Sequence, residues 1–210
     1  MENERALVPR QPPKLHKTNQ QLAIRHQREY QADQVPHISI EDVRRMAAQV
    51  KERDQLLIRL LFDGCLRASE AVSVRPKDIE EDVGWLVRIL GKGDKWGSVA
   101  ISPSLAAQLQ AYAYRKGIPF DQRIFPITRY RVHQIVSRAM ERAGVSKPAH
   151  VGAVHVLRHS GAIERLRQTG NPKALQDQLR HKSAAMTLRY LKTLSQQESL
   201  RIQEEVDLRW

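Results

Sequence analysis

Residues 53–72 read RDQLLIRLLFDGCLRASEAV and carry the clearest local signals in the chain. Apolar side chains recur at helical spacing up to Phe62, so we expect a strongly apolar helix that stops at Gly64. A second helix is predicted to open at Ala68. Arg67 then lies at the start of that helix, where backbone N–H groups and the helix dipole favour an anion. The stretch predicts two helices with an anion-binding arginine between them.

The pattern on both sides of this stretch is mostly helical. Upstream, SIED (39–42) is similar to a capping box in front of VRRMAAQV, so folding is expected to begin near residue 37. Downstream, the apolar runs WLVRIL (85–90) and SVAIS (98–102) flank GKGDK (91–95), which predicts a β-hairpin. Further helices are predicted over 103–116, 128–143, 154–169, 172–179, 184–190 and 195–206. The predicted fold class is mainly α with a small antiparallel β-sheet.

The composition excludes several classes of protein. With 210 residues, 41% hydrophobic and 28% charged, the chain fits a globular domain. No run approaches the roughly 18 apolar residues of a membrane-spanning helix, and the N-terminus lacks the apolar segment of a signal peptide. We therefore expect a cytoplasmic protein. Cys65 is the single cysteine, which excludes an internal disulfide, and no Cys/His pair has the spacing of zinc ligands.

The positive charge is concentrated in one region. The formal net charge is +12, and residues 121–192 hold 14 basic and 4 acidic side chains. Such an excess of positive charge indicates nucleic acid or an acidic membrane surface as the partner. The alternative is that the surplus Lys and Arg side chains do no more than solvate the protein surface. Arg129, Arg131 and Arg138 lie at partly helical intervals, as in a helix along a DNA groove; a solvated face is the alternative.

Two segments near the C-terminus carry side chains suited to phosphate chemistry. In HVLRHSGA (155–162), His155 and Arg158 are three residues apart and share one helix face. Arginine binds phosphate bidentately and histidine titrates near neutrality, so the pair suits an anion that exchanges protons. We interpret the neighbouring His159 as a packed residue. Downstream, His181 in LRHKS is followed by Tyr190 in MTLRY.

The order of these residues resembles the tyrosine recombinase (phage integrase) family. The likeness covers roughly residues 37–195, and it is closest to minimal members such as the fimbrial phase-variation invertases and to Xer-type recombinases. It implies the tyrosine recombinase catalytic-domain fold and site-specific cutting and rejoining of DNA, whether integration, excision, inversion or resolution. The residues that match the family's catalytic set are Arg67, Lys92, His155, Arg158, His181 and Tyr190.

The resemblance implies a role for each member of this set. The two arginines hold the scissile phosphate, and Lys92 protonates the leaving 5′-oxygen, with Lys95 as the alternative hairpin lysine. His155 is implied as general acid/base, and His181 as a support for the phosphate. The nucleophile is Tyr190, which forms a 3′-phosphotyrosyl bond on the way to a Holliday junction.

Elementary chemistry agrees with these roles. A phenol with a pKa near roughly 10 attacks poorly at neutral pH unless its proton is removed and positive charge stabilises the phenolate. Fixed guanidinium groups also stabilise the charge that develops on the phosphate oxygens. A two-metal nuclease needs clustered carboxylates, and residues 155–192 contain only Glu164 and Asp177. We therefore expect no metal and no cofactor, and GKGDK lacks the pattern of an ATP-binding loop.

Three features depart from the family pattern. Arg180 stands where the family usually has glycine before the histidine, so it either strains the turn before His181 or adds a contact to DNA phosphate. We favour the added contact, because arginine is tolerated there if the backbone is helical. Cys65 replaces a small or glycine-like residue and is interpreted as buried. The family also carries an N-terminal DNA-clamping domain, whereas residues 1–36 form only a basic, Gln-rich arm in front of the predicted catalytic domain 37–210.

The expected partner is double-stranded DNA at specific recombination sites. The resemblance implies a tetramer on DNA, with accessory proteins, in which the C-terminal helix 195–206 docks on a neighbouring protomer. The alternative is that this helix folds back onto its own core. Two other functions stay open. One is a non-catalytic DNA-binding regulator on the same scaffold, and the other is an activity like that of a type IB topoisomerase.

Overall fold

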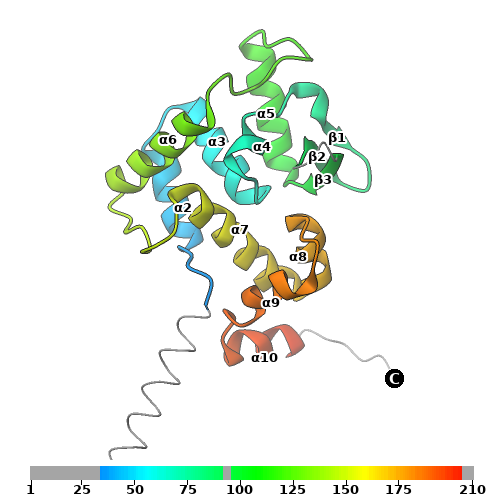
Figure 1. The fold of residues 1–210 in the computed structure, drawn as a ribbon. Coiled ribbons are helices and arrows are strands. Elements are labelled where there is room, and N and C mark those ends of the chain that lie inside the picture. Colours follow the sequence, from blue (N-terminus) through cyan, green and yellow to red (C-terminus); the bar gives the residue numbers. More distant parts are fainter. Residues whose placement is uncertain (1–33, 92–95, 205–210) are drawn as a thin grey trace, which may run out of the picture. The chain divides into compact units, whose positions relative to one another are not determined.

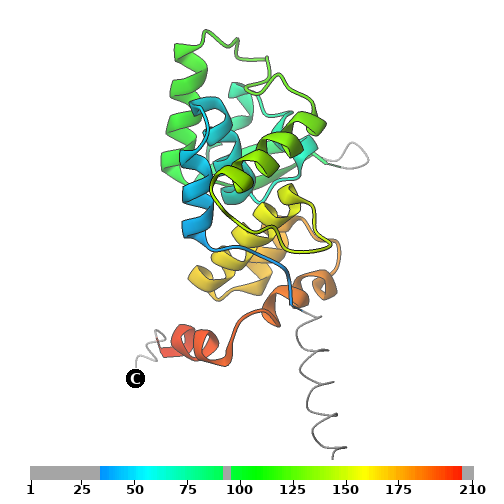
Figure 2. The same cartoon turned by 90° about the vertical axis from the view of Figure 1, so that its left-hand side faces the viewer.

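The computed structural model describes residues 34–91 and 96–204, so most of the predicted arm, the hairpin residues Lys92 and Lys95, and the end of the last predicted helix lie outside the described residues. The helices in chain order are α2 (Ile40–Ala48), α3 (Glu52–Asp63), α4 (Ala68–Ala71), α5 (Pro103–Arg115), α6 (Arg129–Arg142), α7 (Ala153–Thr169), α8 (Pro172–Leu179), α9 (Ala184–Leu191) and α10 (Gln196–Glu204). A short 3-10 turn covers Pro76–Asp78. Figures 1 and 2 both place α5 at one end of this part and α10 at the other.

The predicted helix start at Ser39 and the predicted stops at Gly64 and Gly170 are confirmed. The Ser39 hydroxyl accepts a hydrogen bond from the Asp42 N–H, and the Asp42 carboxylate accepts one from the Ser39 N–H, which completes the capping box of α2. Gly64 caps α3, and Gly170 ends α7 in the left-handed conformation that glycine adopts without a Cβ penalty.

Three strands form one antiparallel sheet, in the order β1 (Ile79–Glu81), β2 (Trp85–Leu90), β3 (Trp96–Ala100). The predicted hairpin is β2 and β3, with Val87 opposite Val99. Val87, Ile89 and Val99 are buried, as the alternation of a one-sided sheet requires. Strand β1 was not predicted, because three residues, two of them glutamates, give no strand signal without the pairing of Ile79 with Val87.

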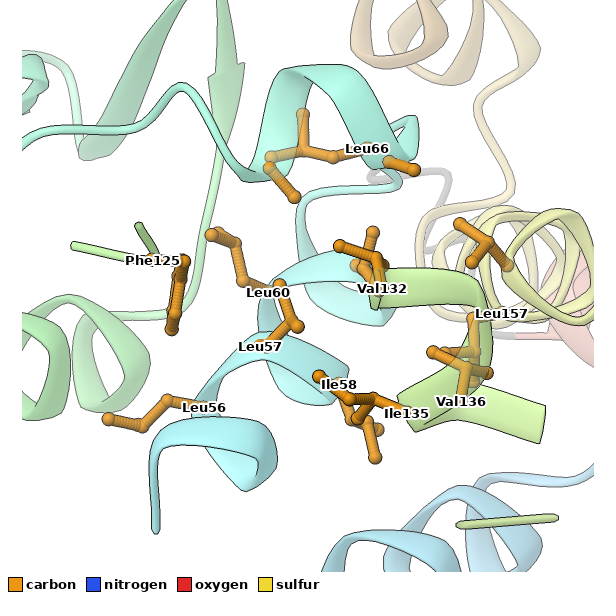
Figure 3. Packing of buried hydrophobic residues seen from close by; sticks show 14 of the residues in the cluster. Leu56, Leu57, Ile58, Leu60, Leu66, Phe125, Val132, Ile135, Val136 and Leu157 are labelled. Atoms are coloured by element: carbon orange, nitrogen blue, oxygen red, sulfur yellow. The ribbon is translucent and has the colours of Figure 1, made fainter. Parts of the chain in front are cut away.

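Helix α3 lies at the centre of the main hydrophobic core. It packs against α2, α5 and α7, and Figure 3 shows its Ile58 beside Ile135 of α6. Leu57, Ile58, Leu60 and Leu61 are fully buried. A helix that is apolar over most of its circumference must be buried, which explains why RDQLLIRLLFDG has a central place.

A second, smaller hydrophobic cluster joins the C-terminal half of α7 to α8 and α9. It contains Cys65, Leu166, Leu179 and Tyr190, all of them buried. Cys65 is therefore buried, as the sequence analysis expected. Because the ring of Tyr190 packs in this cluster, the position of its hydroxyl depends on how α8 and α9 fold against α7.

Candidate active site

Arg158 is held rigidly by main-chain carbonyls from two distant segments. Its side chain projects from α7, is only 6% exposed, and donates hydrogen bonds to the carbonyl of Cys65 and, at 2.9 Å, to the carbonyl of Leu179. Cys65 has a φ of 50° and Arg180, which follows Leu179, has a φ of 54°. These left-handed residues end α3 and α8, and each end leaves a carbonyl free for the guanidinium.

Glu70 gathers three arginines around one buried carboxylate. It is 4% exposed and accepts hydrogen bonds from Arg67 through both the backbone N–H and the guanidinium, each at 2.8 Å. Arg180 also donates to Glu70, and an Arg158 nitrogen lies 3.9 Å from it. Burial raises the pKa of Glu70, but the Arg67 N–H and the nearby guanidinium charges outweigh this effect and hold the pKa below its usual value. Three cations around one anion leave surplus positive charge, which favours a further anion such as phosphate.

Glu70 was not predicted as part of the site. The signal was present, because Glu70 is the third residue of α4 and its carboxylate caps the helix by reaching back to the Arg67 N–H. The same pattern was recognised at Ser39 but not here. What the sequence could not reveal is that Arg158 and Arg180 also converge on this carboxylate.

The backbone at Arg180 corrects an expectation. A right-handed helical backbone was expected, whereas the residue is left-handed, which strains any residue with a Cβ. Its guanidinium points to Glu70, and its Nε is buried without a hydrogen-bond partner. Its Cδ lies against Gly97 of β3, where an added Cβ would come within 3.1 Å. The arginine thus links the turn before His181 to α4 and to the sheet.

Comparing Arg180→Gly with Arg180→Ala should reveal the strain at this position. Both variants lose the contact with Glu70, but only glycine adopts the left-handed conformation freely. We expect the glycine variant to be more stable than the alanine variant by about 1 kcal/mol, measured by urea denaturation. Equal stabilities would contradict a left-handed Arg180.

Tyr190 lies on α9 among three histidines. Its side chain is buried, and its Oη lies 2.9 Å from Nδ1 of His159. The ring of His181 is 6.1 Å from the tyrosine ring, and the ring of His155 is 6.4 Å from that of His159. The Nδ1 atom of His181 is also 3.0 Å from the Thr187 hydroxyl, which orients that imidazole. Burial raises the pKa of Tyr190, against the opposing charge of Arg158.

The interpretation of His159 as merely packed was therefore incomplete. His155 and His159 are four residues apart on α7, so the helix places both imidazoles on one face. That spacing was visible in the sequence, but it does not indicate what the second imidazole touches. Only the packing of α9 against α7 brings the Tyr190 hydroxyl to His159.

The histidines of the site are neutral at physiological pH. Burial first, then the charge of Arg158 and other groups, lowers the pKa of His155. Burial and the neighbouring cations lower the pKa of His159 and of His181 to about 4. A neutral imidazole has one nitrogen that accepts a hydrogen bond, which a protonated one lacks.

These lowered pKa values predict that the fold weakens in mild acid. Unfolded histidines titrate near 6.5, whereas His159 and His181 titrate near 4 in the folded protein. Between these values the unfolded state binds more protons, so the free energy of unfolding falls as pH drops through this window and is level above it. Allowing for partial exposure, we expect a loss of about 2 kcal/mol from pH 7 to pH 4.5. Urea denaturation of the His159→Gln, His181→Gln double variant should show a clearly smaller loss, and an equal loss would contradict the assignment.

Helix α6 presents its arginines on two different flanks. At about 100° per residue, Arg129 lies near His133, while Arg131 and Arg138 lie together on the opposite flank. His133 is close enough to His155 to lower its pKa, so its flank adjoins the site. All three arginines are exposed. Arg129 is therefore the one on the side of His155.

Five of the six predicted catalytic residues fall into two contact groups, and the charge of Arg158 in the first acts on His155, His181 and Tyr190 in the second. Glu70 joins Arg67 to Arg158, and the rings of His155, His181 and Tyr190 are linked through the histidine cluster. Lys92 and its alternative Lys95 lie outside the described residues. The strand that follows them is tied to α8, because the Gln178 side chain hydrogen-bonds to both backbone groups of Ala100.

Within residues 34–91 and 96–204, no three His, Cys, Asp or Glu side chains group closely enough to hold a metal ion. No helix of this part is long and apolar enough to cross a membrane.

Residues 31–197 match the sequence profile of the phage integrase family, which covers most of the chain and the whole site. The chain belongs to the phage integrase family. Among its relatives in this family, tyrosine recombinase XerC of Xanthomonas axonopodis pv. citri (strain 306) is 31% identical over 144 residues, which are 66% of this chain and 46% of the relative. XerD of Corynebacterium glutamicum is 30% identical over 168 residues, 75% of this chain and 52% of that protein. The chain thus spans about half the length of these relatives.

Solved structures of the phage integrase family share the fold. The XerH recombinase bound to a palindromic difH substrate, in a post-cleavage complex, matches with a TM-score of 0.66 and 23% identity over 82% of this chain and 54% of that one. The catalytic domain of bacteriophage HP1 integrase matches with a TM-score of 0.58 and 24% identity, over 80% of this chain and 94% of that one. The expected fold class, mainly α with a small antiparallel sheet of the tyrosine recombinase type, is confirmed.

Proposed function

We propose that this protein is a site-specific recombinase that cuts and rejoins DNA strands through Tyr190. The observation that supports it most directly is a rigidly held arginine whose charge acts on a buried tyrosine. Arg158 is fixed by the carbonyls of Cys65 and Leu179, and its charge acts on the Tyr190 phenol. A fixed cation beside a phenol suits attack on an anionic phosphodiester. Family membership agrees with this chemistry.

The reaction begins when the scissile phosphate binds between Arg67 and Arg158. The surplus positive charge around Glu70 attracts the phosphate, and the guanidinium groups stabilise the charge that builds up on its oxygens. Tyr190 Oη bonds to phosphorus while the bond to the 5′-oxygen breaks. In the family pattern, Lys92 gives that oxygen a proton, His155 acts as general acid/base and His181 supports the phosphate. The covalent phosphotyrosyl bond keeps the energy needed for rejoining.

The proposal also includes the DNA substrate and the assembly that binds it. The DNA is a specific recombination site, bound by a tetramer with accessory proteins in the cytoplasm. Arg129, Arg131, Arg138 and Arg180 are proposed to contact DNA phosphates. For Arg180 this requires the guanidinium to face both Glu70 and the DNA.

Covalent trapping tests the proposed function. Nicked duplexes with a randomised core are incubated with the protein, and DNA that stays attached under denaturing conditions is recovered and sequenced. We expect the wild type to retain a specific sequence and Tyr190→Phe to retain none while still binding the recovered site. Absence of any wild-type adduct would favour a non-catalytic regulator, and adducts at sequences without preference would favour an activity like that of a type IB topoisomerase.

Salt dependence tests the exposed arginines of α6. Each phosphate that a protein neutralises releases counterions, so the logarithm of the binding constant falls linearly with the logarithm of salt concentration. Replacing Arg129, Arg131 or Arg138 singly with Gln should reduce the magnitude of that slope by about one for each residue that contacts a phosphate. Fluorescence anisotropy with the recovered duplex measures the binding constant at each salt concentration. An unchanged slope would show that the replaced arginine does not contact a DNA phosphate.

A further inference from the structure

The reaction described above leaves His159 without a role, although His159 contacts the atom that attacks. Nδ1 of His159 lies 2.9 Å from Tyr190 Oη, and the two rings are 5.8 Å apart. Among the described residues, no other side chain hydrogen-bonds to that oxygen. His155, the general acid/base of the family pattern, makes no such bond to Tyr190 in this part of the chain. The contact joins α7 to α9 across 31 positions of sequence.

We propose that His159 is the base of the strand-cleavage step: its Nδ1 accepts the hydrogen bond of the Tyr190 hydroxyl, aligns Oη, and takes the phenolic proton as Oη bonds to phosphorus. This inference rests on the proposed function. The electron pair of the broken bond goes to the 5′-oxygen, which receives its proton from the acid of the site. During rejoining the 5′-hydroxyl gives its proton back to that acid as its oxygen bonds to phosphorus, the tyrosine oxygen leaves, and His159 returns the phenolic proton to it.

The direction of the hydrogen bond follows from the chemistry of the two groups. A phenol has one proton to donate, and a neutral imidazole has one nitrogen that accepts. The charged and titratable groups facing His159 come from three segments: His155 and Arg158 on α7, His181 after α8, and Arg189 on α9. Together with burial they hold the pKa of His159 at about 4, so Nδ1 is free of a second proton at neutral pH.

The same surroundings make the base responsive to the substrate. A phosphate bound to Arg158 offsets one of the charges that disfavour a protonated His159. Negative charge then increases on the phosphate as the phenolic proton arrives on the imidazole. His159 is therefore a stronger base when DNA occupies the site than when the site is empty.

The test uses the DNA site recovered by the wild type and measures single-turnover adduct formation. His159→Phe keeps a ring but removes the acceptor, whereas His159→Asn keeps an acceptor but takes no proton at neutral pH. We expect both variants to slow adduct formation by about 100-fold or more, with DNA affinity within twofold of wild type. Exposed His150, replaced with Asn as the matched control, should leave the rate unchanged.

A substrate with sulfur in place of the bridging 5′-oxygen shows which proton transfer a variant has lost, the one to the leaving group or the one from Tyr190. A thiolate leaves without protonation, so this substrate should restore cleavage by Lys92→Ala but not by either His159 variant. Rescue of the His159 variants would overturn the proposal, because it would place His159 at the leaving group. A wild-type rate in His159→Asn would reduce the residue to alignment, and a faster rate in His159→Phe would mean that the contact holds Tyr190 back; either result overturns the base assignment.

A measurement without DNA separates this inference from the proposed function. The ¹⁵N chemical shift of His159 Nδ1 should move when Tyr190→Phe removes the donor, at a pH where the imidazole is neutral. An unchanged shift would overturn the hydrogen bond, and with it the inference, whether or not the protein cleaves DNA. Loss of all wild-type adducts with a normal shift change would instead count against the proposed function, and so against any base role.

Discussion

Replacing Arg158 with alanine is expected to lower the rate of adduct formation by about 1,000-fold or more, because one fixed guanidinium beside a phosphoryl group contributes that much in related chemistry. The variant should also be less stable. Two buried carbonyls, of Cys65 and Leu179, lose their donor, and Glu70 loses a neighbouring cation. Single-turnover trapping on the recovered site measures the rate, and urea denaturation measures the stability.

A matched control on the same helix separates the two effects. Arg165 on α7 binds the carboxylate of Asp63 and the carbonyl of Ala100, at 2.7 and 3.0 Å. Arg165→Ala should therefore destabilise the protein while the folded fraction cleaves at nearly the wild-type rate. If Arg158→Ala lost no more activity than Arg165→Ala, the loss would be due to impaired folding, and Arg158 would not be a catalytic residue.

Replacing Gly161 with alanine is expected to cause the largest loss of stability from a single methyl group. An added Cβ would lie 1.9 Å from the carbonyl oxygen of Phe62 and 3.1 Å from the sulfur of Cys65. The obstacle is backbone, so α3 and α7 would have to separate. We expect a loss of about 3 kcal/mol or more, seen as a melting temperature lower by about 10 °C.

Gly84 provides the control for this substitution. It lies in the turn between β1 and β2, and an added Cβ there would meet nothing within 4 Å. Gly84→Ala should therefore change the melting temperature by no more than about 2 °C. A comparable fall in both variants would mean that close packing at Gly161 is not what makes α7 sensitive.

Gly161 also illustrates what a sequence leaves open. It is part of HVLRHSGA, in which His155 and Arg158 were predicted to be catalytic from their side-chain chemistry. Glycine has no side chain from which such a role is predicted. Its importance arises from the approach of α3 to α7, two helices separated by many residues in the chain. No local pattern predicts that approach, because the sequence of a helix with a small residue is the same whether or not another helix packs against it.

The candidate site was predicted in part for similar reasons. The positions of Arg67, His155 and Tyr190 follow from motif order and helical spacing, which are properties of the chain itself. Glu70 and His159 escaped because a carboxylate and an imidazole are common on helices, and only their partners distinguish them. The backbone conformation of Arg180 was not predicted, because its handedness depends on how α8 ends.

The sequence by itself determined the helices, the hairpin, the regional charge and the family, since periodicity, turn residues and motif order are local or need only the order of residues. Three contacts depend on the tertiary structure alone. Three arginines surround Glu70, the carbonyls of Cys65 and Leu179 both accept hydrogen bonds from Arg158, and the Tyr190 hydroxyl contacts His159. The physical reason is that these contacts, apart from the local one between Arg67 and Glu70, join groups that are distant in sequence. Their geometry is fixed by the packing of α3, α7, α8 and α9 rather than by the preference of any one segment.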